Sequence, residues 1–203
     1  MKKIETIWQY ILLCALDEGV FRHTQQDLAR RFEISLSTVH HALGIPTAIG
    51  AIRKESKFFV LDDALKLLYY WASVRNLKRR IIYQTHVNAR VQDIEGLALP
   101  TCVFGGYSAG KMILGETPAD YSAVYFYDKR ENLKQTKERF PPNAQKPANV
   151  FVLEKTGNML SKDMFTNLPL TFVDIWNLPD WYAKDFTKAL EEKIHALLSR
   201  HHH

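Results

Sequence analysis

The chain contains 203 residues, of which 46% are hydrophobic and 24% are charged, and its formal net charge is +5 at pH 7. This composition excludes a disordered chain and supplies enough apolar side chains for one large domain or two small ones. No segment approaches the roughly 18 uninterrupted apolar residues of a membrane-spanning helix. The first segment carries Glu5, Gln9 and Asp17, where a signal peptide would be apolar. We therefore expect a cytoplasmic protein that does not contact a membrane.

The cysteines and histidines give no sign of a metal centre. Cys14 and Cys102 are isolated in apolar segments, a pattern that fits neither a disulfide framework nor a zinc site, so both are predicted to be buried thiols. His23, His86 and His195 lack the spacing of metal ligands, so no metal and no cofactor is expected. The terminal segment 200–203, Arg-His-His-His, resembles the remnant of a purification tag.

The excess positive charge lies in the first part of the chain. Residues 1–80 contain 13 Lys and Arg against 8 Asp and Glu, whereas residues 81–203 contain 14 of each kind. We therefore predict a basic module at 1–80 that meets a polyanion, followed by a neutral module at 81–199 with a different task.

Two short helices with a tight turn are predicted in Thr24–Leu43, after a first amphipathic helix within Met1–Val20. Thr24 is a helix N-cap, and the small side chain of Ala29 lets a second helix cross closely. The segment "EIS" forms the turn, after which Ser35 or Ser37 caps the second helix. The apolar face of that helix consists of Val39, Ala42 and Leu43. This spacing is typical of a helix-turn-helix.

The second of these helices presents polar side chains on its outward face. Short or planar polar groups of this kind contact phosphates and base edges when a helix lies in the major groove of DNA. The predicted DNA-contacting residues of this helix are Ser35, Ser37, Thr38, His40 and His41. Mere packing of two helices with solvent-facing histidines is the alternative.

The segment Gly50–Leu61 predicts a β-hairpin with a basic tip. Its residues alternate in polarity and end in a β-rich run, with Arg53, Lys54 and Lys57 close to a tight turn. A hairpin at this point after two helices is the wing of a winged helix, and its cations would contact the DNA backbone. After the hairpin, Asp62 is expected to cap an amphipathic helix that carries Leu65, Leu68, Tyr69 and Ala72 on one face.

Strands and helices alternate in the second module, which indicates a small α/β domain. Helices are predicted at Tyr107–Leu114, Glu131–Phe140 and Asp180–Leu198, with Ser108 as the cap of the first of them. The predicted strands are Ile81–Val91, Tyr121–Tyr127, 149–154 and Leu170–Trp176, and residues 98–104 form an apolar segment. The expected fold class is thus α+β or α/β, with an N-terminal winged helix-turn-helix and a small C-terminal α/β domain.

The segment "VFGGYSAGKMILG" raises an alternative, a nucleotide site. Gly105 and Gly110-Lys111 imitate a phosphate-binding loop, but Met112 replaces the hydroxyl residue that would hold magnesium. A nucleotidyltransferase pattern needs two carboxylates after the Gly-Gly turn, and here Asp120 is followed by Ser122 in the second place. The candidate nucleotide-binding residues under this alternative are Gly105, Gly106, Ser108, Lys111 and Asp120. We favour a strand-to-helix turn, with no catalytic residue and no enzyme activity.

The predicted winged helix, the helix "DDALKLLYYWASVRNL", the segment "GGYSAGKMILGETPADYSAVYFY" and the α/β half after them resemble a known family. Together they look like the AbiEi-type antitoxin regulators of type IV toxin–antitoxin systems. The resemblance covers most of the chain. It implies a DNA-binding domain that represses its own operon and a second domain, similar to a degenerate nucleotidyltransferase fold. That domain would oppose a nucleotidyltransferase-like toxin without binding it stably.

The sequence thus predicts a transcriptional regulator that binds double-stranded operator DNA, as a homodimer because pairing extends a short recognition site. Two other hypotheses remain at this point. The second module could be a nucleotide-binding or nucleotidyl-transferring enzyme with a DNA-binding attachment, or it could sense a small-molecule effector. A hydrolytic triad of Ser108, His86 and an Asp lacks the G-x-S-x-G turn that such a nucleophile needs.

Overall fold

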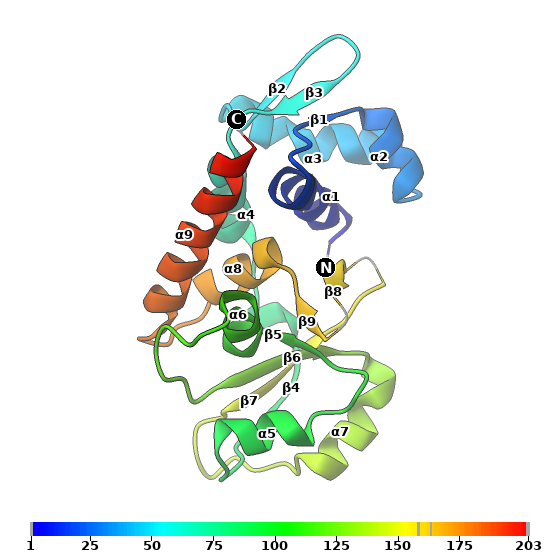
Figure 1. Ribbon diagram of the computed structural model, residues 1–203. Coiled ribbons are helices and arrows are strands. Elements are labelled where there is room, and N and C mark those ends of the chain that lie inside the picture. Colours follow the sequence, from blue (N-terminus) through cyan, green and yellow to red (C-terminus); the bar gives the residue numbers. More distant parts are fainter. Residues whose placement is uncertain (1, 158, 163, 202–203) are drawn as a thin grey trace. The chain divides into compact units, whose positions relative to one another are not determined.

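The computed structural model describes residues 2–157, 159–162 and 164–201, and it is a mixed α/β structure with two sheets (Figure 1). The chain divides into two compact units. The first consists of Met1–Arg75, Asn158–Leu160 and Glu192–His203, and the second of Asn76–Gly157 and Ser161–Glu191. The division falls after Arg75 rather than after residue 80, and the first unit also takes in two later segments.

The first unit alternates helices with a small antiparallel sheet. Its elements are α1 (Lys3–Leu13), the π-helical turn η1 (Cys14–Glu18), β1 (Arg22–His23), α2 (Gln25–Arg31), α3 (Leu36–Ala48), β2 (Ile52–Lys54), β3 (Phe59–Leu61) and α4 (Ala64–Val74). The strand order is β1-β3-β2, with Arg22 opposite Val60 and Ile52 opposite Leu61. Helix α1 packs against α3 and α4. After α1, Gly19 ends the π-helical turn η1 in the left-handed conformation, at φ 67°.

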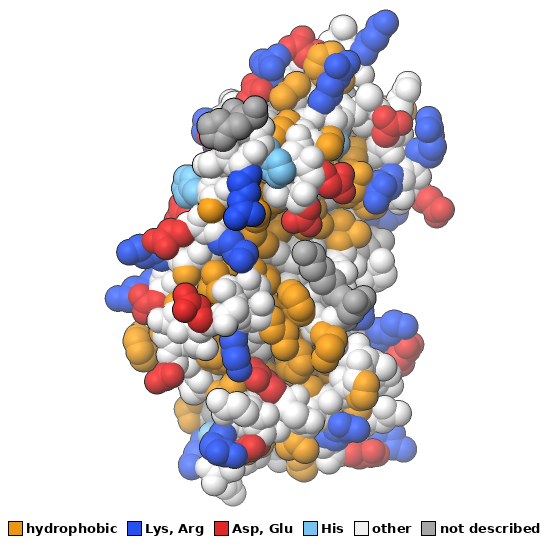
Figure 2. Space-filling model, viewed as in Figure 1, with side chains coloured by type: hydrophobic (Ala, Val, Ile, Leu, Met, Phe, Trp, Pro, Cys, Tyr) orange, Lys and Arg blue, Asp and Glu red, His pale blue; other side chains and the backbone are white. Residues whose placement is uncertain are grey.

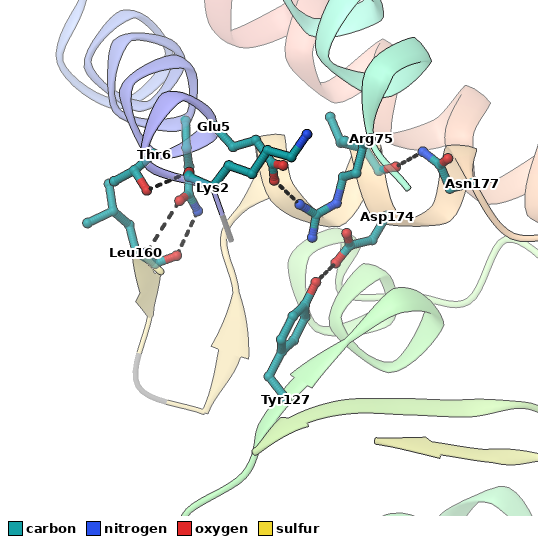
Figure 3. Close-up of polar contacts among 10 residues, drawn as sticks. Lys2, Glu5, Thr6, Arg75, Tyr127, Leu160, Asp174 and Asn177 are labelled. Atoms are coloured by element: carbon teal, nitrogen blue, oxygen red, sulfur yellow. Dashed lines mark hydrogen bonds and ion pairs between the residues drawn. The ribbon is translucent and has the colours of Figure 1, made fainter. Parts of the chain in front are cut away.

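Apolar side chains from all four helices form the core of the first unit. They include Ile7, Ile11, Leu28, Val39, Leu43, Leu67 and Trp71, each 2% exposed or less. The indole Nε1 of Trp8 donates to the carbonyl of Ala42 at 2.8 Å and thereby ties α1 to α3. Arg75 forms a buried ion pair with Glu5, with 2.5 Å between Nη1 and Oε2 (Figure 3).

The second unit is built on a mixed six-stranded sheet of order β4-β7-β6-β5-β9-β8. Its strands are β4 (Ile81–Thr85), β5 (Val103–Gly105), β6 (Val124–Asp128), β7 (Val150–Glu154), β8 (Ser161–Lys162) and β9 (Phe165–Thr166). Its helices are η2 (Lys78–Arg80), α5 (Val91–Leu97), α6 (Gly106–Leu114), η3 (Arg130–Asn132), α7 (Leu133–Arg139) and α8 (Leu168–Trp176). Helix α9 (Ala183–Arg200) is divided between the units after Glu191.

The middle of the sheet is its most buried part. Every residue of β6 is buried, and this strand pairs antiparallel with β5 and parallel with β7. Helices α6 and α8 lie on one face of the sheet, and α5 and α7 lie on the other (Figure 1). The core on the second face includes Ile94, Phe126, Phe140 and Val152. Among the described residues, no helix combines the length and the apolar character that crossing a membrane requires.

Several predicted elements are wrong. Leu170–Trp176 is not a strand but most of helix α8, which Asn167 begins by accepting a hydrogen bond from the Leu170 amide at 3.2 Å. A short, mostly apolar run that is buried except at its last residue has no periodicity that separates a buried strand from a buried helix. Strand β4 ends at Thr85 and not, as was predicted, at Val91. Val91 is instead the first residue of helix α5, which was not predicted.

Helix α4 is shifted from its prediction. Its N-cap is Asp63, whose carboxylate accepts from the Lys66 amide at 2.8 Å, and not Asp62. Of the predicted apolar face, Leu68 and Ala72 are buried, whereas Leu65 and Tyr69 are only half-buried. Leu67 and Trp71, which were not predicted, are buried as well.

Candidate nucleic-acid interface

Side-chain caps fix the start of both α2 and α3. The Thr24 hydroxyl accepts from the Asp27 amide at 3.1 Å, and the Ser35 hydroxyl accepts from the Thr38 amide, also at 3.1 Å. Each cap satisfies a backbone donor that has no partner within its helix. Between the helices, Glu33 adopts φ 50°, and the Ile34 amide returns to the Ala29 carbonyl at 3.0 Å. The two caps therefore confirm the predicted helix starts, with Ser35 rather than Ser37 at the second.

Helix α3 has one buried and one exposed face. Val39, Ala42 and Leu43 are buried in the first unit, as predicted. The predicted DNA-contacting residues of this helix lie on the other side: Ser35, Ser37, His40 and His41 are exposed, and Thr38 is half-buried. Ser35 and Thr38 share a hydroxyl contact of 2.8 Å, so their oxygens are partly occupied within the helix. The histidines have more freedom to meet a partner.

Strands β2 and β3 form the predicted hairpin. Lys54 lies opposite Phe59, and the Glu55 amide donates to the Phe58 carbonyl at 2.8 Å to close the turn. Cationic and acidic side chains lie side by side around this hairpin (Figure 2). Lys57 is exposed and Lys54 is half-buried. Within the described ranges, neither lysine belongs to an ion pair.

Arg53, on the same hairpin, is in a different electrostatic environment. Its Nε lies 2.9 Å from Oδ2 of Asp62, and its Nη1 bonds to the carboxylate of Glu55. The hydrogen bond and the charge of Asp62 raise the pKa of the guanidinium. Two carboxylates thus neutralise Arg53, whereas Lys57 forms no ion pair among the described residues.

A groove of about 420 Å³ connects the start of α2, the start of α3 and the hairpin tip. Its lining residues are Thr24, Gln25, Gln26, Leu36, Glu55, Ser56, Lys57 and Phe58. Gln25, Gln26 and Ser56 are polar groups that the sequence prediction missed. The position of the two glutamines could have revealed them. Both directly follow the N-cap of α2, and the N-terminal end of a helix favours anions.

The nucleotide-site alternative brings fewer of its residues together. Gly105 ends β5 and Gly106 begins α6, so the segment that would have to be an open loop is already helical. Lys111 lies in the second turn of that helix, 3.9 Å from Oε2 of Glu95. Asp120 is exposed in the loop after α6. The predicted strand-to-helix turn is therefore confirmed.

Aromatic side chains fill the space beside the two glycines. A Cβ on Gly105 would lie 3.0 Å from Cε2 of Tyr127, and one on Gly106 would lie 3.1 Å from Cδ2 of Tyr125. Gly106 also has a φ of 52°. The Tyr127 hydroxyl donates to Oδ2 of the buried Asp174 at 2.5 Å (Figure 3). The glycines thus permit close packing of rings, where a phosphate-binding turn would leave open space.

Ser108 does not cap helix α6, contrary to prediction. The N-cap position is Gly105, which offers no side-chain cap. Ser108 is 1% exposed, and its hydroxyl has no hydrogen-bond partner within the described residues, so it is not bonded to His86 in a hydrolytic pair. His86 instead places Nδ1 2.9 Å from the carbonyl of Pro147.

Tyrosine hydroxyls around α6 hold structural hydrogen bonds. Tyr107 donates to Asp180 at 2.9 Å, and Tyr121 donates to Glu95 at 2.7 Å. Burial, followed by the hydrogen bond to a carboxylate, raises the pKa of both hydroxyls above the ordinary tyrosine value. Both hydroxyls therefore stay protonated at neutral pH.

Within residues 2–157, 159–162 and 164–201, no three His, Cys, Asp or Glu side chains are gathered as a metal site would require. The free thiols of Cys14 and Cys102 are buried, as predicted. Comparison of the chain with family models, with curated proteins and with solved structures gave no match.

Proposed function

We propose that the chain is a transcriptional regulator that binds double-stranded DNA through the exposed face of α3 and the β2–β3 hairpin. The element order of the first unit, α1-β1-α2-α3-β2-β3-α4, is compatible with a winged helix. The observation that carries the proposal is the single groove that joins the starts of α2 and α3 to the hairpin tip. A recognition helix and a wing that contact one duplex need such a common surface.

The groove and the helix would contribute differently to binding. Lys57 at the hairpin tip would contact phosphates, which supplies affinity without sequence information. His40 and His41 project from the exposed face of α3 and would meet base edges, which supplies specificity. Gln25 and Gln26, at the start of α2, would donate hydrogen bonds to phosphates of the DNA backbone.

The test is a fluorescence-anisotropy titration of the full chain with a duplex from the region upstream of its gene and with a scrambled duplex. His40→Ala together with His41→Ala is expected to reduce the preference for the upstream duplex. His195→Ala replaces an exposed histidine of α9, outside the proposed surface, and serves as the matched control. Absence of duplex binding at low salt would refute the proposal.

The biological role that we propose is an autorepressing antitoxin, which acts as a dimer on its own operator and opposes a nucleotidyltransferase-like toxin. The resemblance of the sequence to AbiEi-type regulators supports this role. The test is co-expression with the product of the neighbouring gene. Restored growth would support the antitoxin role, and a neighbouring gene whose product is harmless would contradict it without affecting the DNA-binding proposal.

A further inference from the structure

A second hollow in the first unit lies between α1, β1 and α2. Its volume is about 360 Å³, within the range of small-molecule sites. Tyr10 of α1, Arg22 and His23 of β1, and Leu28 and Arg31 of α2 contribute to its walls. Neither the folding of the unit nor the proposed contacts with DNA bases account for two arginines at one hollow.

Both arginines are stacked on aromatic rings. The guanidinium carbon of Arg31 lies 4.4 Å from the ring centroid of Tyr10, and that of Arg22 lies 3.7 Å from the ring centroid of Phe58. Stacking orients the guanidinium plane and leaves the N–H donors at its edge available for a carboxylate. Among the residues that the structure describes, neither arginine forms an ion pair or a side-chain hydrogen bond.

Neighbouring arginines of the same unit are already partnered. Arg30 lies 3.7 Å from Asp27, and Arg53 is held by Asp62 and Glu55. Of the four arginines within residues 22–53, the two that form no ion pair among the described residues are therefore the two that line the hollow.

The charge of the hollow favours a monoanion. Burial lowers the pKa of His23, so its ring is neutral at neutral pH and adds no charge. Asp27, the acidic residue of the lining, accepts from the Thr24 hydroxyl at 2.7 Å and pairs with Arg30 outside the hollow. Among the lining side chains, two guanidinium groups against this one carboxylate leave one excess positive charge, and Glu18, outside the lining, also acts on Tyr10 and His23.

The walls of the hollow suit a flat apolar body. The Tyr10 ring packs edge-on against Phe32 at 5.4 Å and lies 6.0 Å from the His23 ring, while Leu28 is buried beside them. An aromatic ring would meet aromatic and aliphatic surfaces here, and a carboxylate on it would reach the guanidinium edges. We propose that this hollow binds a small aromatic carboxylate.

Such a molecule would be an effector of the regulator, and only that role rests on the proposed function. Thr24 lines this hollow as well as the groove at the hairpin, and it caps α2, so a ligand would contact the start of a DNA-facing helix. Binding of the carboxylate itself does not depend on DNA.

The experiment is a titration of the ¹⁵N-labelled full chain with benzoate, followed by NMR, with benzamide as an uncharged ligand of the same shape. Benzoate is expected to shift the resonances of Tyr10, His23 and Leu28 saturably, whereas benzamide should bind at least about tenfold more weakly because it lacks the charge. Arg31→Gln and Arg22→Gln, which change different elements, should each weaken benzoate binding about tenfold. Arg79→Gln, which changes an exposed arginine of η2 in the second unit, should leave it within about twofold.

Three outcomes would overturn the proposal: no saturable shifts, equal binding of benzoate and benzamide, or an equal loss in the Arg79→Gln and Arg31→Gln variants. A DNA duplex is then added to the protein saturated with benzoate. Retained shifts at the hollow support a separate small-molecule site. Weaker benzoate binding in the presence of the duplex supports the effector role, because coupling between two ligands of one protein is reciprocal. An unchanged benzoate affinity would contradict the effector role while leaving the small-molecule site itself established.

Discussion

Lys57 and Arg53 lie on the same hairpin but in different surroundings, and replacing each with glutamine tests which cation contacts DNA. The Arg53 guanidinium is bonded to Asp62 and Glu55, whereas Lys57 is exposed and belongs to no ion pair among the described residues. A cation that is already neutralised by two carboxylates displaces few counterions from DNA. We therefore expect the two substitutions to change the salt dependence of binding unequally.

The size of the effect follows from counterion release. Each phosphate contact contributes about 0.9 to the slope of log K against log salt concentration. Between about 50 and about 200 mM salt, one contact is then worth about 3.5-fold in affinity. Lys57→Gln should lower the slope by about 0.9, and Arg53→Gln should lower it by less than half as much.

Anisotropy titrations of one duplex over this range of salt concentration measure the slopes. Lys134→Gln, which removes an exposed cation from α7 in the second unit, controls for the loss of one positive charge anywhere on the chain. Equal slopes for Lys57→Gln and Lys134→Gln would show that the hairpin tip does not contact phosphates. A larger effect of Arg53→Gln than of Lys57→Gln would refute the argument from charge pairing.

Three further predictions concern buried titratable groups. Arg75→Met should lower the free energy of unfolding, measured in urea, by about 3–5 kcal/mol, because Glu5 is left buried without the guanidinium of its ion pair. Adding Glu5→Leu to that variant should restore part of the lost free energy of unfolding. Burial, with Asp128 nearby, raises the pKa of Cys102 to about 12, so mass spectrometry should detect alkylation by iodoacetamide in the unfolded chain and none in the folded one. Burial lowers the pKa of His23 below 6.5, so the stability that its neutral ring contributes is present above pH 6.5 and is lost as the pH falls below that value. Urea unfolding at several pH values should show this loss, and His23→Gln should reduce it.

The local features of the first unit were predictable because they depend on neighbours in the sequence. Thr24 and Ser35 each cap a helix that starts at the next residue, and the burial of Val39 and Leu43 follows helical spacing. Leu170–Trp176 could not be assigned in the same way, since all of it except Trp176 is buried whether it forms a strand or a helix. Its start signal was outside the run, in Asn167 and in a proline within the first turn.

The electrostatics of the candidate site depended on pairings that the sequence does not reveal. Arg53 meets Asp62, nine positions away, because the register of β2 and β3 places the end of one strand beside the start of the other. Charge counting assigns Arg53 and Lys57 equal weight, and only the pairing separates them. The hollow beside Tyr10 likewise depends on three elements that converge from α1, β1 and α2.

The glycines of "GGYSAGK" show how a motif can arise from packing alone. A Cβ on Gly105 or Gly106 would press on a tyrosine ring of β6, and a Cβ on Gly110 would lie 2.9 Å from the Phe186 ring of α9. All three glycines therefore sit where α6 meets its neighbours closely, which is a sufficient reason for their identity without a bound phosphate. The charge of Lys111 likewise has a partner in the protein, since its Nζ lies 3.9 Å from Oε2 of Glu95 on α5. The spacing of a phosphate-binding loop is thus reproduced by a helix that begins directly after a strand and packs on aromatic rings.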